Sequence, residues 1–272
     1  MTEAIPGFEK TKFEFEGRKH RYYRGGKTGP PVVVLHESPG MHPAVIAFAR
    51  RLVDEGYRVY MPSLFGRDKA PANLGAWALM GAQLCIRREF EILGDRASAA
   101  VTWLRKLASL ANDECGGKGV GVVGMCFTGG FALAMAVDKF VVAPVLSQPS
   151  LPFAIGRSRK SQIGLSPDDL ATVKERTLDG LKVLGLRFTN DRLCPRERFA
   201  TYASELGPAF RQFPITAPDP AWNIRRGAHS VLASDFVPVV GHPTRLALQA
   251  VFDFLDERLR GSRDAPRAGT TR

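Results

Sequence analysis

Residues 120–130 constrain the fold of this chain more tightly than any other segment. Their sequence, VGVVGMCFTGG, begins as an apolar run rich in valine, passes through Gly124 into a turn of small residues, and continues as a helical pattern. A strand that enters a helix through so tight a turn needs small residues where a larger side chain would clash. The segment therefore predicts a buried strand that presents Cys126 at the amino end of a helix.

The rest of the chain alternates between strand and helix patterns. We expect an edge hairpin within 13–23, strands over 31–36, 57–61, 120–123, 140–146, 181–188 and 210–215, and helices over 44–55, 89–107, 129–137, 168–179, 196–206 and 244–259. Short, continuously apolar runs such as 31–36 are typical of strands covered on both faces. The pattern predicts an α/β fold with a mostly parallel central sheet flanked by helices on both faces.

The domain organisation follows from two segments that break this alternation. A chain of 272 residues is long enough for one large α/β domain, and we expect a single domain over residues 1–260. Residues 147–180 are rich in proline and basic residues, which predicts an excursion over the sheet edge, as a lid or flap. Residues 261–272 have almost nothing to bury and are expected to form a disordered basic tail.

Composition and charge narrow the class of protein. Hydrophobic residues make up 44% of the chain and charged residues 24%, as in ordinary soluble globular proteins. The formal net charge is +11, but the basic residues are scattered along the chain, so we expect a small-molecule substrate and no nucleic-acid partner. The four cysteines form no Cys-x-x-Cys pair and have no nearby histidines at metal-ligand spacing, so neither a zinc site nor a disulfide framework is expected, and the thiols should be free.

No segment indicates export or a membrane. Residues 1–20 mix charged and isolated apolar residues and lack the apolar core of a secretory signal. No later apolar run approaches the ~20 residues that span a bilayer. The expectation is a cytoplasmic protein, either a monomer or a homodimer.

Cys126 is the strongest candidate for chemistry. It occupies the centre of Gly124-x-Cys126-x-Thr128-Gly129, which has the form of a nucleophile elbow, with the helix terminus behind it favouring a developing anion. Thr128 stands where such elbows usually carry glycine. The alternative is a buried core cysteine, because cysteine is among the most buried residue types.

Two further residues follow in the order typical of α/β-hydrolases, nucleophile, then acid, then histidine. Asp191 comes after a predicted strand and before a helix, although a helix-capping aspartate would occupy the same place. His229 lies between the last strand and the last long helix, and is preferred over His242, which adjoins a proline at a helix start and is interpreted as structural. His20 and His42 are expected on solvated surface segments.

The constellation resembles the dienelactone hydrolase family, an α/β-hydrolase family. The resemblance covers roughly residues 30–259 and rests on the cysteine elbow, the aspartate before a proline-containing loop, and the His229-Ser230 pair. The family also has a glutamate after its early strand, and Glu37, in the sequence HESPG, fills that place. The resemblance implies that Glu37 contacts the Cys126 thiol in the resting enzyme while Asp191 orients His229.

The resemblance also implies a reaction. The backbone amides of Phe127 and Ser38 would form the oxyanion hole, Cys126 would attack an ester or lactone carbonyl to give a thioester, and water activated by His229 would release the acid. No cofactor would take part.

The family's substrate anchor is incomplete in this chain. Dienelactone hydrolases hold the substrate carboxylate with arginines, one of them shortly after the histidine, whereas here His229 is followed by SVLA. Arg87 and Arg88 are candidates to replace part of that anchor, or else solvated residues of a helix start. Dienelactone itself is therefore expected to be a poor substrate.

Two other functions use the same residues. One is an α/β-hydrolase scaffold that binds a ligand or partner without turnover. The other is acyl transfer to an alcohol or amine, which differs from hydrolysis only in whether water is excluded at deacylation.

Overall fold

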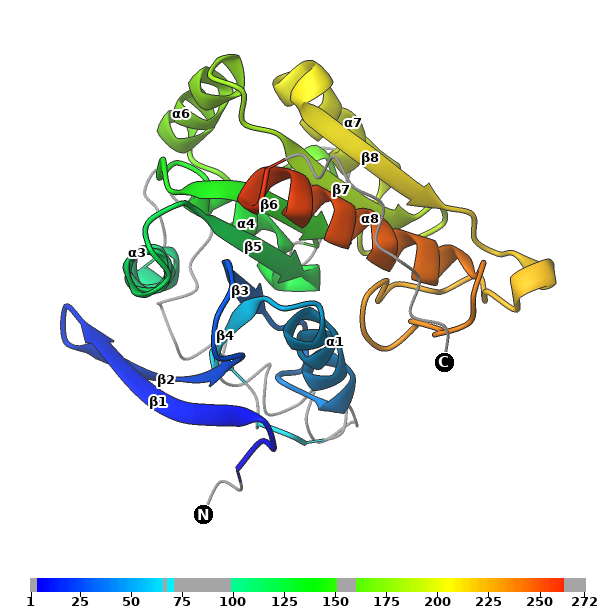
Figure 1. Cartoon of the computed structure of the whole chain (residues 1–272). Coiled ribbons are helices and arrows are strands. Elements are labelled where there is room, and N and C mark those ends of the chain that lie inside the picture. Colours follow the sequence, from blue (N-terminus) through cyan, green and yellow to red (C-terminus); the bar gives the residue numbers. More distant parts are fainter. Residues whose placement is uncertain (1–3, 66–67, 71–98, 151–159, 262–272) are drawn as a thin grey trace.

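The computed structural model describes residues 4–65, 68–70, 99–150 and 160–261, and everything below refers to these residues. They form one sheet of eight strands in the order β1-β2-β4-β3-β5-β6-β7-β8 (Figure 1). The strands are β1 (Phe8–Phe15), β2 (Arg18–Gly25), β3 (Pro31–Leu35), β4 (Arg58–Pro62), β5 (Val120–Met125), β6 (Val141–Ser147), β7 (Val183–Phe188) and β8 (Phe210–Ile215).

The sheet is antiparallel at one edge and parallel elsewhere. β1 and β2 form a hairpin, β2 pairs antiparallel with β4, and every pair from β4 to β8 is parallel. The chain runs from β3 outward to β4, and β5 then pairs with the other side of β3. This reversal is the kind of switch point at which open α/β sheets bind ligands, beyond the carboxyl ends of the strands.

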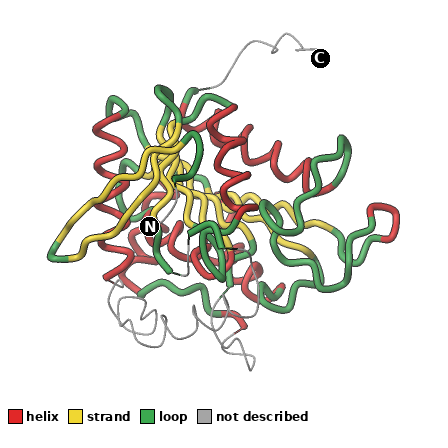
Figure 2. Tube along the Cα trace, turned by 90° about the horizontal axis from the view of Figure 1, so that it is seen from below, coloured by secondary structure: helices red, strands yellow, loops and turns green. Residues whose placement is uncertain are grey.

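Helices cover both faces of the sheet (Figures 1 and 2). One buried cluster contains residues of α1 (Pro43–Asp54) and α8 (Pro243–Leu259). The other contains residues of α3 (Ala99–Glu114), α4 (Gly129–Met135), α6 (Pro167–Leu178) and α7 (Arg196–Leu206). The described residues also include the short 3-10 helices η2 (Cys126–Thr128), η3 (Gly207–Ala209) and η4 (Pro220–Trp222).

β3 shows why the central strands are continuously apolar. Val32 and Val34 belong to the cluster under α1 and α8, whereas Val33 and Leu35 belong to the cluster on the other face. All four side chains are fully buried. Because successive side chains of a strand point to opposite faces, a sheet covered on both sides needs apolar residues at every position. The predicted α/β-hydrolase fold, with its mostly parallel sheet, is confirmed.

The predicted elements differ from the observed ones mainly at their ends. The hairpin is longer than the predicted 13–23. Of the helix expected over 89–107, residues 99–107 lie in α3, which continues to Glu114 with Ala108 and Ala111 buried, whereas residues 89–98 lie outside the described residues. Within the predicted lid segment 147–180, α6 packs against α4 and α7. Residues 151–159 and the predicted tail from 262 onward lie outside the described residues, so the lid and the tail stay predictions.

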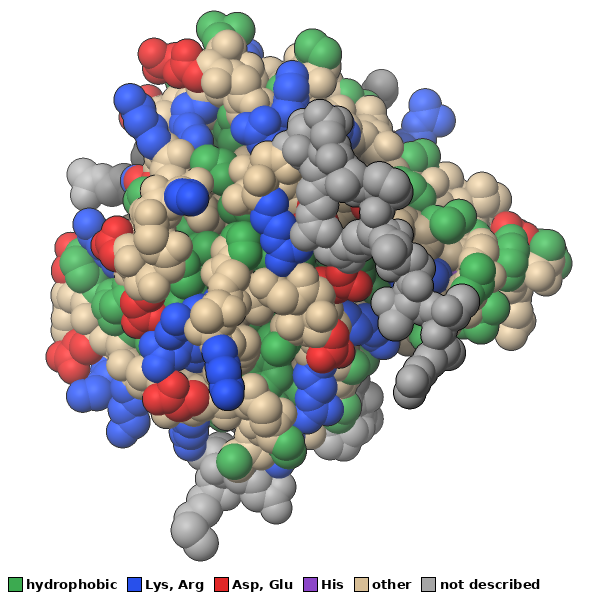
Figure 3. Space-filling model, viewed as in Figure 1, with side chains coloured by type: hydrophobic (Ala, Val, Ile, Leu, Met, Phe, Trp, Pro, Cys, Tyr) green, Lys and Arg blue, Asp and Glu red, His purple; other side chains and the backbone are tan. Residues whose placement is uncertain are grey.

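No helix in the described part of the chain is long and apolar enough to cross a membrane. On the face shown in Figure 3, Lys and Arg side chains are interspersed with Asp and Glu and do not merge into one continuous patch.

Candidate active site

Cys126 begins the turn between β5 and α4, and its backbone has φ of 55°, in the left-handed region. A cysteine there is strained, because its Cβ crowds the backbone. The turn is tight on both sides. A Cβ added at Gly124 would lie 2.3 Å from the Thr128 carbonyl oxygen, and one at Gly129 would lie 2.7 Å from Pro149 Cα. These glycines let the strand enter the helix with the thiol at the carboxyl edge of the sheet.

Thr128 ties the turn to the neighbouring strand. Its hydroxyl accepts a hydrogen bond from the Met125 amide at 3.1 Å, and its proton faces the carbonyl oxygens of Leu35 at 3.0 Å, Met125 at 3.0 Å and His36 at 3.2 Å. The side chain is fully buried. A glycine cannot make these bonds, so the departure from the usual elbow pattern adds a direct link between the Cys126 turn and the end of β3.

Asp191 and His229 meet across the edge of the sheet. The Asp191 carboxylate accepts hydrogen bonds through Oδ1 from the amides of Leu193, at 2.9 Å, and Cys194, at 3.2 Å, while Oδ2 lies 2.7 Å from His229 Nδ1. The aspartate side chain is 2% exposed. A carboxylate held this way fixes the ring orientation and places the proton on Nδ1, which leaves Nε2 to act as a base.

The Cys126 thiol influences the ionisation of His229. Burial alone would lower the pKa of His229, but its hydrogen bond to Asp191 and its interactions with the Cys126 thiol raise that pKa well above the ordinary 6.5. Because His229 Nδ1 is hydrogen-bonded to Asp191, Nε2 is the ring nitrogen left to interact with the Cys126 sulfur. Among the described residues Nε2 has no partner at full hydrogen-bond geometry. Apo active sites often show such loose contacts, which tighten when substrate binds.

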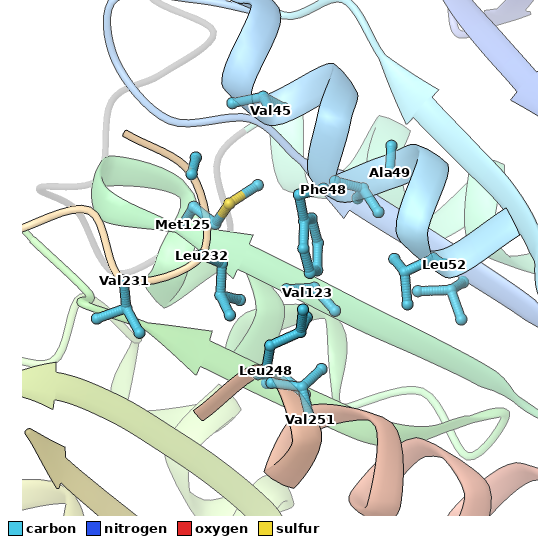
Figure 4. Packing of buried hydrophobic residues seen from close by; sticks show 14 of the residues in the cluster. Val45, Phe48, Ala49, Leu52, Val123, Met125, Val231, Leu232, Leu248 and Val251 are labelled. Carbon is cyan, nitrogen blue, oxygen red and sulfur yellow. The ribbon is translucent and has the colours of Figure 1, made fainter. Parts of the chain in front are cut away.

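The loop that carries His229 is held from two sides. The Asp235 carboxylate accepts hydrogen bonds from the backbone amides of His229, at 2.8 Å, and Ser230, at 3.0 Å. On the inner side, the next two residues, Val231 and Leu232, are fully buried among side chains of α1, β5 and α8 (Figure 4). The backbone on either side of the imidazole is therefore anchored.

Glu37 lies at the end of β3, in a buried polar cluster. Its Oε1 accepts hydrogen bonds from Ser230 Oγ at 2.7 Å, His42 Nε2 at 3.0 Å and Ser234 Oγ at 3.3 Å, and its Oε2 accepts one from Gln148 Nε2 at 3.0 Å. Within the described structure none of these bonds goes to the Cys126 thiol, so the contact implied by the resemblance is not among them. Glu37 instead connects the end of β3 to the histidine loop.

The other histidines have structural partners. The prediction for His42 is wrong: this side chain is 4% exposed, because the Glu37 carboxylate provides a hydrogen-bond partner in the interior. His242 is structural as predicted, since its Nδ1 accepts a hydrogen bond from the Thr244 amide at the start of α8. His20 is partly exposed and its ring lies 4.9 Å from that of Trp103.

A fifth histidine shapes the end of β3. His36 is fully buried, and burial lowers its pKa to about 4, so the ring is neutral at ordinary pH. Its Nε2 accepts a hydrogen bond from the Leu64 amide at 3.1 Å and its Nδ1 lies 3.2 Å from the Glu37 carbonyl oxygen, which assigns the proton to Nδ1. The ring thereby links the chain after β4 to the chain after β3.

The two residues expected to supply oxyanion-hole amides lie just after two adjacent strands. Phe127 follows Cys126 in η2, and Ser38 follows Glu37 after β3. β3 and β5 pair directly, with Leu35 opposite Gly124, so both residues follow strands that end at the same edge of the sheet. Their assignment stays a prediction.

The predicted substrate-anchoring residues Arg87 and Arg88 lie outside the described residues. A pocket of about 410 Å³ opens beside the acid and histidine loops, and its lining includes Arg192 and Arg226, two exposed arginines that sequence reasoning did not single out. His, Cys, Asp and Glu side chains form no group of three or more that could hold a metal ion in the described part of the chain.

Sequence reasoning also missed Gln148, Asp235 and Ser234. Each is a polar residue in a loop, a context in which a solvated side chain is the ordinary expectation. The one available signal was the Ser230 that follows His229, and even that signal identifies neither Gln148 nor Asp235 as partners.

Comparisons with known proteins agree with this fold. The model of the dienelactone hydrolase family matches residues 21–152. Among solved structures, a dienelactone hydrolase from Anabaena variabilis has a TM-score of 0.62 and 16% identity, covering 93% of this chain and 100% of that chain. A cold-adapted esterase from an Arctic intertidal metagenomic library has a TM-score of 0.57 and 15% identity, covering 94% and 97%.

A thioesterase domain from the curacin biosynthetic pathway is similar in the same way, with a TM-score of 0.55 and 12% identity over 90% of this chain and 99% of that chain. At these identities the likeness shows the fold alone. The search of curated proteins finds no match. The matched segment contains β3, the cysteine elbow and β6, which carry much of the site described above. The chain thus has the fold of the dienelactone hydrolases and esterases among these structures, and its residues 21–152 match the dienelactone hydrolase family.

Proposed function

We propose that the chain hydrolyses small carboxylic esters or lactones through a thioester formed on Cys126, with His229 as the proton carrier and Asp191 as the residue that orients it. The observation that carries the proposal is the strained elbow: a cysteine at φ of 55° whose thiol interacts with an imidazole that a buried carboxylate holds at 2.7 Å. Backbone strain of this kind persists where the surrounding structure enforces it, and it clusters at active sites.

The proposed reaction has two stages. In the first, His229 Nε2 takes the proton of the Cys126 thiol, and the resulting thiolate attacks the carbonyl carbon. The tetrahedral intermediate then collapses to a thioester as the leaving oxygen takes that proton from His229 Nε2. In the second, His229 Nε2 removes a proton from water, the hydroxide attacks the thioester, and the thiolate departs as the acid is released. The raised pKa of His229 supports this role, because a more basic imidazole takes up a proton more readily.

The amides of Phe127 and Ser38 are assigned to the oxyanion. The backbone supports this assignment, because the two residues follow β5 and β3, which pair with each other. Removing a single oxyanion donor typically lowers the rate ~10²–10³-fold. Since both donors are backbone groups, side-chain substitutions at these two positions should matter less than any change that moves the turn.

The experiment that tests the nucleophile combines kinetics with labelling. Cys126→Ala should abolish hydrolysis of small aryl esters, and iodoacetamide should inactivate the wild type in step with alkylation of Cys126. Cys115→Ala, at a half-buried free cysteine, serves as the matched control and should keep full activity. Inactivation that follows the modification of Cys85, Cys115 or Cys194 instead would overturn the assignment.

The experiment that tests the base compares two histidines. His229→Ala should lower kcat ~10²–10⁴-fold, the usual contribution of a positioned general base. His242→Ala removes the same ring from the start of α8 and should leave kcat within a few-fold of the wild type once the variant is shown to be folded. An equal loss of kcat in both folded variants would contradict the proposal.

Substrate range is the remaining part of the proposal. We expect poor hydrolysis of dienelactone relative to neutral aryl esters and bulkier lactones, because the arginine expected after His229 is missing. Comparing kcat/KM across such a panel tests this expectation. A clear preference for dienelactone would refute it, and Arg192→Gln and Arg226→Gln would then test whether the pocket beside His229 holds the carboxylate.

A further inference from the structure

We propose that Gln148 is a positioning residue of this active site, whose side-chain amide holds the end of β3 and the histidine loop in their working arrangement. The inference rests on the proposed function, because it assigns a role in that reaction. Gln148 directly follows β6 and contacts neither Cys126 nor His229 through its side chain in any hydrogen bond of the described structure. Its effect is transmitted through the residues that it binds.

The amide of Gln148 bridges two loops. Its Nε2 donates a hydrogen bond to Glu37 Oε2 at 3.0 Å, and its Oε1 accepts one from the Val231 amide at 3.3 Å. The Ser147 hydroxyl also donates to Oε1. The orientation of the amide follows from these partners, because only this arrangement pairs a donor with the carboxylate and an acceptor with the amide and hydroxyl. Val231 lies two residues after His229, and Glu37 immediately precedes Ser38.

The backbone around Gln148 connects it to the third part of the site. The Ser150 amide donates to the carbonyl oxygen of Cys126 at 2.9 Å, and the Ser150 hydroxyl donates to the Gln148 carbonyl oxygen at 3.0 Å. The loop after β6 therefore contacts the cysteine turn, the end of β3 and the histidine loop.

The conformation of Gln148 is costly. Its φ of 37° lies in the left-handed region, where a residue with a Cβ is strained relative to the right-handed conformation. The side chain is fully buried, so an unmade hydrogen bond would leave a polar group without water. The side-chain hydrogen bonds of Gln148 all go to the two active-site loops or to its neighbour Ser147. A positioning role accounts for a strained and buried polar residue with these partners.

Glutamine meets a requirement here that few side chains meet. The position needs a donor toward a carboxylate and an acceptor toward a backbone amide, at the reach of a five-atom side chain. A glutamate in its place has nearly the same shape but, when ionised, offers no donor and puts a second negative charge beside Glu37. When the substituted glutamate is protonated, its carboxyl group offers one donor and one acceptor, as the glutamine amide does. The charged and titratable groups around this position are Glu37, His42, His229, Cys126 and Arg198, whose guanidinium donates to the Pro149 carbonyl oxygen.

The test is the pH dependence of two variants relative to the wild type. Gln148→Met keeps the volume and removes all three side-chain hydrogen bonds, so kcat should fall roughly 10–100-fold with KM little changed. The ratio of kcat to the wild-type value should not vary with pH. Gln148→Glu should show a ratio that rises toward one as the pH falls, because a carboxyl pair that shares a proton restores the donor. Gln212→Met and Gln212→Glu make the same changes on the exposed β8 edge and should leave kcat unchanged at every pH.

The outcomes separate the role of Gln148 from the proposed function. A Gln148→Met variant whose kcat equals that of the wild type would overturn the positioning role. Folded Gln148→Met and Gln148→Glu variants whose kcat depends on pH in the same way would overturn it too. If the wild type itself hydrolyses no ester, the proposed function fails. The rate of Cys126 alkylation by iodoacetamide then provides the readout for the same variants, since it depends on how His229 meets the thiol and not on turnover. Where the Met variant does not fold, the Glu variant and its pH profile decide.

Discussion

Replacing Thr128 by valine should destabilise the protein far more than its small change in shape implies. The threonine hydroxyl is fully buried, accepts a hydrogen bond from the Met125 amide and faces three carbonyl oxygens with one proton. Valine keeps the branched shape but offers no donor or acceptor. It therefore removes two hydrogen bonds and leaves at least one buried backbone group without a partner.

The magnitude follows from those losses. Two hydrogen bonds contribute about 1 kcal/mol each, and a buried amide left unsatisfied costs about 1–3 kcal/mol, with the two effects partly overlapping. We expect Thr128→Val to lower the free energy of unfolding by about 2–4 kcal/mol, a large part of the ~5–15 kcal/mol typical of folded proteins. Thr128→Ser is the matched control, because it keeps the hydroxyl and loses one buried methyl group, at a cost of about 1 kcal/mol.

The assay is urea denaturation monitored by circular dichroism. The free energies of unfolding of both variants and the wild type are compared, provided that their m-values are equal. The expected order of stability is wild type, then the serine variant, then the valine variant. The valine variant should also lose kcat, because the tie between the Cys126 turn and the end of β3 is gone. A valine variant at least as stable as the serine variant would refute the reasoning, since packing and not hydrogen bonding would then hold the turn.

Two further predictions concern the proposed catalytic residues. Cys126→Gly should be about 1 kcal/mol more stable than Cys126→Ala in the same urea assay, because glycine relieves the backbone strain at φ of 55°. An alanine variant as stable as the glycine variant, or more stable, would show that the turn is unstrained. Asp191→Asn should reduce stability most at pH 6 and progressively less toward pH 9. The raised pKa of His229 means that the folded state binds the imidazole proton more tightly than the unfolded state does. The stability that the Asp191–His229 pair contributes is therefore complete below the unfolded-state pKa of ~6.5 and is lost as pH rises through the folded-state pKa. A stability difference between Asp191→Asn and the wild type that grows with pH would contradict this.

The sequence by itself determined the layers of the fold and three positions of the site. Apolar runs such as 31–36 and helical spacing such as that of 244–259 are local properties of the chain, and burial on two faces of a parallel sheet leaves little choice in how such elements combine. Cys126 could be singled out because a strand, a tight turn and a helix within eleven residues are themselves local. Asp191 and His229 followed from their order along the chain and from their places at strand ends.

The tertiary structure alone decided how the polar residues pair. Glu37 binds Gln148 and Ser230 across separations of 111 and 193 residues, and no periodicity in the sequence encodes such partners. His42 illustrates the consequence: a loop histidine is ordinarily solvated, and only the carboxylate that the fold brings beside it makes its burial possible. Hydrogen bonds between loops depend on strand register and on the positions of both backbones to within a fraction of an ångström, which the pattern of apolar and polar residues does not specify.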